Sequence, residues 1–186
     1  MVKLGLVVLL ALSAFGCGGS SSARSTAGPE AGPGPASVPA SQAQAQLTPQ
    51  EREILDLIER YLASPSEAPP DAPQRIMVFA ATSSKIMVVL DEKVAPWVTE
   101  EIDDALKQHM LAAYMGGSTA SQLRSGKKDD DLRAGVEATV RVYAALRKQG
   151  ARSAQMEKLV ELDGKGELRA HIDRLIAERA AAMRGG

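Results

Sequence analysis

The stretch Leu47–Ala63, LTPQEREILDLIERYLA, decides what kind of fold this chain builds. Thr48 is suited to cap a helix and Pro49 to occupy its first position, while Glu51, three residues after the cap, completes a capping box. The apolar residues that follow recur at helical spacing and fall on one face: Ile54, Leu55, Ile58, Tyr61 and Leu62. We therefore predict an amphipathic helix over residues 49–63.

The next apolar stretch, residues 75–90 (RIMVFAATSSKIMVVL), is ambiguous. Read as a helix, it places one seam of residues together: Ile76, Ala80, Ser83, Met87 and Leu90. Read as two short runs around Thr82-Ser83-Ser84, it could form a β-hairpin, but its centre has no Gly, Asn or Asp for a tight turn. A lone hairpin also needs further strands, and no other segment resembles one. We predict a buried helix here, with the hairpin as the alternative.

Further helices are predicted toward the C-terminus. One is capped by Thr99, carries acidic residues in its first turn and ends or kinks at Gly116-Gly117, with a further piece over 119–125. The others are expected over residues 132–148, from Ser153 to Leu162, and over residues 167–183. The expected fold class is therefore all-α, a small irregular bundle of about five to seven helices.

Upstream, residues 1–17 (MVKLGLVVLLALSAFGC) have the pattern of a secretory signal. Lys3 precedes an uncharged apolar run that is shorter than the roughly 20 residues a membrane-spanning helix needs. The run ends in Ala14-Phe15-Gly16-Cys17, which resembles the lipobox of bacterial lipoproteins. That resemblance implies cleavage by signal peptidase II before Cys17, a diacylglyceryl thioether on its sulfur and usually an N-linked acyl chain such as palmitate.

Cysteine usage agrees with this interpretation. Cys17 is the only cysteine of the chain, so it has no partner for an intramolecular disulfide. A free thiol in an oxidising compartment would be reactive, and acylation removes that problem. We expect a signal peptide over residues 1–16, an acylated Cys17 followed by a disordered Gly/Ser/Pro/Ala linker over 17–46, and a helical domain over 47–186.

The resemblance to a lipobox also implies where in the cell the protein lies. Two or three acyl chains hold a protein on a membrane stably. Gly18, and not Asp, follows the cysteine, which by similarity to enteric sorting signals is no cue for retention at the inner membrane. We therefore expect a cell-envelope protein, anchored at the outer membrane and facing the periplasm.

Composition argues against several other classes of protein. Loss of the signal removes Lys3 alone, so the mature chain keeps 21 basic residues against 23 acidic ones. Such a balance gives no electrostatic reason to bind nucleic acid, and we expect no nucleic-acid partner. No cysteine follows Cys17, which excludes thiolate zinc sites and disulfides from the helical domain.

No motif for catalysis or metal binding meets its spacing rules. The stretch 117–128 (GSTASQLRSGKK) lacks the glycine spacing and the final Ser or Thr of a phosphate-binding loop. Loops starting at Asp129 or Asp163 lack the glycine that calcium-binding loops need at position six. The two histidines, His109 and His171, are too few for a metal site. We predict no catalytic residue, no cofactor and no metal, and we expect a protein that is not an enzyme.

The most distinctive segment is residues 111–123, LAAYMGGSTASQL, where small residues cluster although each helical Gly costs about 1 kcal/mol relative to Ala. It is interpreted either as a helix end followed by a new start, or as a place where a second helix or a partner approaches closely. The residues of a possible interaction surface are Trp97, Tyr114, Met115, Gly116, Gly117 and Gln122. The leading expectation is a lipid-anchored binding or structural domain with a protein partner in the envelope. The alternatives are a periplasmic carrier or chaperone for an apolar ligand, or an enzyme without a recognisable motif.

Overall fold

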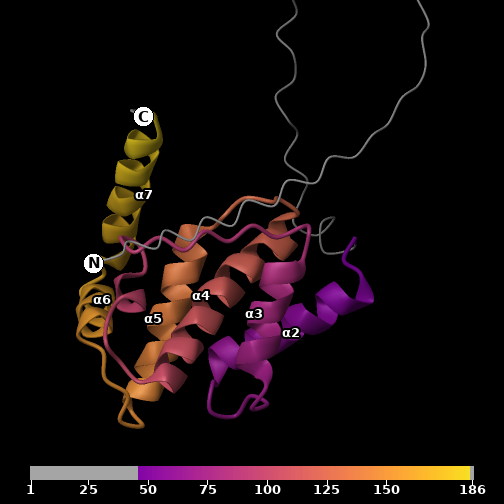
Figure 1. Cartoon of the computed structure of the whole chain (residues 1–186), viewed down its shortest axis with the longest axis horizontal. Coiled ribbons are helices and arrows are strands. Elements are labelled where there is room, and N and C mark those ends of the chain that lie inside the picture. The colour runs from indigo at the N-terminus through magenta and orange to yellow at the C-terminus, as the bar shows by residue number, and fades with distance from the viewer. Residues whose placement is uncertain (1–45, 185–186) are drawn as a thin grey trace, which may run out of the picture. The chain divides into compact units, whose positions relative to one another are not determined.

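Six α-helices and one 3₁₀ helix make up the regular structure of residues 46–184, the part of the chain that the computed structural model describes (Figure 1). The helices are α2 (Pro49–Ala63), α3 (Ala72–Thr82), η1 (Pro96–Val98), α4 (Asp104–Ser125), α5 (Leu132–Arg147), α6 (Ala154–Gly164) and α7 (Leu168–Arg184). None of these residues lies in a β-strand, which confirms the predicted all-α fold class. The predicted signal peptide, Cys17 and the linker through residue 45 lie outside the described residues.

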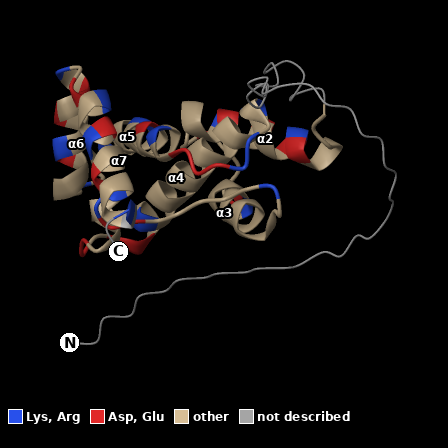
Figure 2. Cartoon of the chain, turned by 90° about the horizontal axis from the view of Figure 1, so that it is seen from above, with Lys and Arg blue, Asp and Glu red and all other residues tan. Residues whose placement is uncertain are grey.

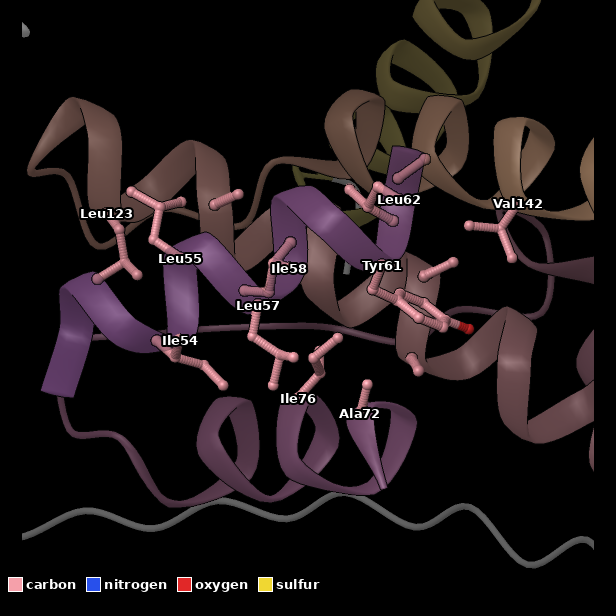
Figure 3. Packing of buried hydrophobic residues seen from close by; sticks show 14 of the residues in the cluster. Ile54, Leu55, Leu57, Ile58, Tyr61, Leu62, Ala72, Ile76, Leu123 and Val142 are labelled. Carbon is pink, nitrogen blue, oxygen red and sulfur yellow. The ribbon is translucent and has the colours of Figure 1, made fainter. Parts of the chain in front are cut away.

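Helix α2 begins as the sequence predicts. The Thr48 Oγ1 accepts a hydrogen bond from the Glu51 amide at 3.2 Å, and the Glu51 carboxylate accepts one from the Thr48 amide at 2.8 Å. The capping box is thus complete, and two amide groups at the start of the helix are satisfied. Its apolar face packs toward α3, α4 and α5, as Figure 3 shows for Ile58, Ile76 and Val142.

The core has two clusters of buried apolar side chains, and α4 and α5 contribute to both. The first lies between α2, α3, α4 and α5, and its large members include Leu57, Ile58 and Tyr61. The second joins α4 and α5 to η1, α6 and α7, with Trp97 and Met110 among its buried side chains. Helices α4 and α5 are therefore the centre on which the other elements pack.

The predicted helix over 75–90 is wrong in its second half. Helix α3 ends at Thr82, and residues 83–95 run without regular structure to η1, so the hairpin is not formed either. Ile76 and Ala80 are buried as expected, whereas Met87 and Leu90 are exposed. The physical reason lies outside the stretch itself, in polar side chains of α4 that bind the backbone after Lys85.

The start and the interior of α4 also differ from the prediction. Asp103, and not Thr99, caps the helix, and its carboxylate accepts a hydrogen bond from the Leu106 amide at 3.0 Å. The helix then continues through Gly116 and Gly117 and ends at Gly126, whose φ of 68° is left-handed. Helices α5, α6 and α7 lie within about two residues of their predicted bounds.

Candidate functional site: an exposed segment held by α4

The exposed large apolar side chains of the described residues gather on α3 and on the segment that follows it. They are Val78 at 51 % relative exposure, Met87 at 40 %, Leu90 at 43 % and Val89 at 36 %. The last three belong to residues 86–90, which we call the edge segment. Figure 2 shows this stretch in tan beside α4, without a charged residue between Lys85 and Asp91. Exposed apolar residues that lie together mark interaction sites more often than scattered ones do.

The side chains of residues 86–89 alternate in exposure, and Leu90 at the end of the edge segment is exposed. Ile86 is buried in the first core cluster, and Val88 is half-buried against both clusters. Met87 and Val89, between and beyond them, are exposed. Such a two-residue alternation is typical of an extended chain with one face on a core. The segment is therefore seated on the domain by Ile86 and Val88 and presents Met87 and Val89 outward.

The backbone of the edge segment is bound by two side chains of α4. The Gln122 side chain accepts a hydrogen bond from the Met87 amide at 2.9 Å and donates one to the Met87 carbonyl at 2.7 Å. The Tyr114 hydroxyl donates to the Val89 carbonyl at 3.0 Å. Gln122 thus satisfies both polar groups of one residue, as a neighbouring β-strand would. Both anchoring residues are themselves buried, so their positions are fixed by the packing of α4.

A polar cluster on α4 and the α4–α5 loop supports these anchors. Ser118 Oγ accepts from the Gln122 side chain at 3.1 Å and from the Asp131 amide at 3.2 Å, and it donates to Asp130 at 3.3 Å. Ser121 Oγ donates to the Asp131 carboxylate at 2.5 Å, and that carboxylate also caps α5. The cluster joins the start of α5 to the same turns of α4 that bind the edge segment.

Burial determines the ionisation of this cluster. Desolvation raises the pKa of Asp130, although the Val89 amide, Arg179 and Ser118 act in the opposite direction by binding the carboxylate. Burial also raises the pKa of the Tyr114 hydroxyl, with a further contribution from the Asp130 charge. Tyr114 therefore stays protonated and remains a hydrogen-bond donor to Val89 at physiological pH.

The glycines of α4 are required by close packing. A Cβ on Gly117 would lie 2.3 Å from the Ala134 carbonyl oxygen and 2.6 Å from the Ala138 Cβ, both on α5. On α5, a Cβ on Gly135 would lie 2.9 Å from the Tyr114 ring of α4. Of the two interpretations of this segment, close approach of a second helix is the one the structure shows. That second helix is α5 of the same chain.

The six residues of the expected interaction surface are therefore mostly interior. Trp97 lies in the second core cluster, and Tyr114, Gly116, Gly117 and Gln122 are buried, while Met115 is half-buried. They do not form one exposed surface, because they pack against other elements of the domain. Tyr114 and Gln122 are nevertheless the two side chains that hold the exposed edge segment in place.

The residues that sequence reasoning missed are Met87, Val89 and Leu90 on the surface and Ser118 and Asp130 beneath it. The sequence does contain one signal for Met87, Val89 and Leu90. Residues 86–90 (IMVVL) are rich in β-branched side chains, which favour extended structure. The role of Ser118 and Asp130 depends on contacts between α4 and the α4–α5 loop, which no spacing of residues along the chain predicts.

Two surface cavities border α4 within the described part of the chain. The first, of about 380 Å³, is bordered by α2, α4 and α5, and Arg124, Glu137 and Arg141 line it together with small residues. The second, of about 470 Å³, lies beside the α4–α5 loop and is lined by Asp130, Asp131 and other polar residues. Because charged side chains line both, neither resembles the Met- and Leu-lined pocket expected of a carrier for an apolar ligand.

The titratable groups of residues 46–184 include no set of three or more His, Cys, Asp or Glu side chains that could hold a metal ion. The His109 ring is stacked on Tyr61, with centroids 6.0 Å apart, and its Nδ1 lies 2.9 Å from the Tyr61 hydroxyl. His171 contacts Arg174 on its own helix. Neither ring is hydrogen-bonded to a serine, so no serine–histidine pair occurs among these residues.

No helix within residues 46–184 has the length and apolar character to cross a membrane. No family model, no curated protein and no solved structure matches the chain. Function is therefore inferred from the residues and contacts of the chain itself.

Proposed function

We propose that this chain is a lipid-anchored protein of the bacterial cell envelope whose helical domain binds a protein partner through the edge segment. The proposal for the anchor is supported by Ala14-Phe15-Gly16-Cys17, which resembles a lipobox. The proposal for binding is supported by one structural observation. An uncharged, outward-facing apolar segment is held rigidly by Gln122 and Tyr114.

The manner in which the segment is held favours a binding role over a merely loose connection. Flexible loops lose conformational entropy when they bind, which weakens their complexes. Residues 87 and 89 already have their backbone fixed by α4, so a partner would meet a preorganised surface. The exposed side chains Met87 and Val89 supply apolar area, and Met adapts readily to the shape of a partner.

The lipid anchor would make such binding effective. Acyl chains on Cys17 would confine the domain to one membrane surface, at the outer membrane facing the periplasm in our proposal. Confinement raises the effective concentration of a partner on the same surface without any additional contact. A small interaction surface then suffices for a complex that would be weak in free solution.

Replacing Cys17→Ser tests the anchor. We expect the full chain to move from the detergent-dependent membrane fraction to the soluble fraction of the cell envelope, because no acyl chain is attached. Ser20→Ala, three residues past the cysteine, is the matched control and should stay with the membrane. Unchanged fractionation of Cys17→Ser, or a mature N-terminus without acyl groups in mass spectrometry, would refute lipidation.

A photo-crosslinking residue at position 89 tests the binding site in intact cells. We expect covalent adducts with protein from position 89, because Val89 faces outward from the edge segment. The control is the same residue at position 158, where Lys158 is exposed on α6. Equal adduct yields from both positions would show that the edge segment has no special role.

A further inference from the structure

The edge segment has a second side that α4 does not use. In an extended chain, the polar backbone groups of successive residues point to opposite sides. The backbone N–H and C=O groups of Met87 and Val89 point to Gln122, Tyr114 and Asp130. The N–H and C=O groups of Val88 and Leu90 therefore point away from α4. Within residues 46–184, no hydrogen bond involves any of these four groups.

We propose that this edge pairs with the edge segment of a second copy of the chain, as an antiparallel two-stranded ribbon centred on Val88. This names the partner of the surface assigned above, and it rests on that proposed function. Exposed edges with unpaired N–H and C=O groups are templates for pairing with another chain, and natural proteins usually block them with charges or proline. Residues 86–90 contain neither.

The positions of the available groups select the register. Antiparallel strands exchange both hydrogen bonds between directly opposed residues at every second position. With Val88 opposite Val88 of the second copy, Ile86 lies opposite Leu90. The two Val88 residues then exchange both of their hydrogen bonds, and each Leu90 amide donates to the opposed Ile86 carbonyl, whereas the Ile86 amide keeps its bond to the Ser83 carbonyl at 3.3 Å. Met87 and Val89, on the outward face, then lie opposite each other across the ribbon and form two apolar cross-strand pairs.

The charges at the ends of the segment match this register. Lys85 of one copy lies opposite Asp91 of the other, and the same pair recurs at the other end by symmetry. Lys85 also contacts Glu51 at 2.8 Å, but its side chain is 59 % exposed and its ammonium group has three donors. A shift of the register by two residues in either direction would lose both Lys85–Asp91 pairs.

The linker of the same chain is a poor occupant of this edge. Residues 18–46 contain four prolines, which lack an amide hydrogen, and Val38 is their one large aliphatic residue. A second copy instead supplies the same β-branched residues that already adopt the extended form. The contact is small for a stable dimer in solution, so we expect it to depend on confinement of both copies to one membrane.

The experiment uses two full-length variants with opposite charge at the outward positions. One carries Met87→Lys and Val89→Lys, and the other carries Met87→Glu and Val89→Glu. Each is produced with two different affinity tags that are crosslinked to each other in the intact membrane, and co-isolation of the linked tags after detergent solubilisation measures pairing on the membrane. Because both side chains are exposed, the substitutions leave the core unchanged. Val78→Lys and Val78→Glu, at an exposed apolar position on α3, are the controls for added charge.

We expect wild-type copies to co-isolate and each variant paired with itself to do so roughly tenfold less, because like charges oppose each other across the ribbon. Mixing the Lys and Glu variants should restore co-isolation, and the Val78 controls should match wild type. No wild-type pairing, equal pairing of all variants, or a mixed pair as weak as the like-charged pairs would each overturn the proposal. If Cys17→Ser still leaves the membrane and position 89 still forms adducts with another protein, the proposed function stands without self-pairing.

Discussion

Helix α4 makes two neighbouring contacts of opposite kinds. Against α5 it presents Gly117, where the absence of a side chain lets the Ala134 carbonyl and the Ala138 side chain approach. Against the edge segment it presents Gln122 and Tyr114, whose polar groups bind backbone. At Gly117 the first contact depends on close fit, and the second depends on hydrogen bonds made by two particular side chains.

The difference separates a structural contact from a surface that can bind. At Gly117 the α4–α5 contact leaves no room for a Cβ, so an added atom there must displace backbone of α5. The edge segment is buried on one side only, and Met87 and Val89 remain outside. A partner can therefore add to the second contact without disturbing the first, while α4 holds both in a fixed relation.

The largest effect is expected from Gly117→Ala, which breaks the α4–α5 contact. Its Cβ would meet the Ala134 carbonyl oxygen at 2.3 Å, and backbone on α5 must move to accommodate it. We expect the free energy of unfolding to fall by about 3 kcal/mol, or about 10 °C in Tm, despite the better helix propensity of Ala. Thermal unfolding followed by circular dichroism measures the change.

Gly116→Ala is the matched control on the same turn of α4. Its Cβ would lie 3.2 Å from the Ile76 Cγ2, a side-chain atom that can shift by a few tenths of an ångström. The strain and the gain of about 1 kcal/mol in helix propensity then nearly cancel, so we expect stability close to wild type. Equal losses in both variants would show that the α4–α5 contact is less tight than its geometry indicates.

An intermediate and more local effect is expected from Gln122→Met, which breaks the second contact. Met keeps most of the side-chain volume but leaves the Met87 amide and carbonyl without their partner on α4. We expect a loss of about 1 to 3 kcal/mol and much faster hydrogen exchange at the Met87 amide, with α2 and α5 protected as before. Gln149→Met, at an exposed loop position, should change neither quantity. Uniformly faster exchange would mean that the edge segment and the core unfold together.

The two contacts also show what the sequence could predict. The helix over 49–63 follows from its capping box and apolar spacing, and the structure confirms both. These are local signals, readable within one or two turns. The all-α class followed in the same way, from several such segments and from short connections.

The edge segment was not predictable by the same route. Its conformation depends on Gln122, which lies 35 residues beyond Met87 in the chain. Helical and extended readings of residues 86–90 place different side chains inward, and local spacing alone did not decide between them. Gly117 was identified from its cost in a helix, but its partner on α5 became evident only from the packing of the two helices.

The smallest effect is expected from pH, at the contact of α4 with α2. The Tyr61 hydroxyl donates to the His109 carbonyl at 3.0 Å and lies beside the His109 ring, and burial lowers the pKa of that ring. The folded state therefore favours the neutral imidazole. Its contribution to stability is full above the unfolded pKa of about 6.5 and is lost as the pH falls below that value.

We accordingly expect the Tm of wild type to fall more between pH 7.5 and pH 5.5 than the Tm of His109→Gln, which has no group that titrates in this range. Gln is a good helix former and keeps a polar side chain at the half-buried position. His171→Gln, which replaces the other histidine, serves as the matched control and should follow wild type. A His109→Gln curve parallel to that of wild type would mean that the contact between Tyr61 and His109 does not respond to protonation.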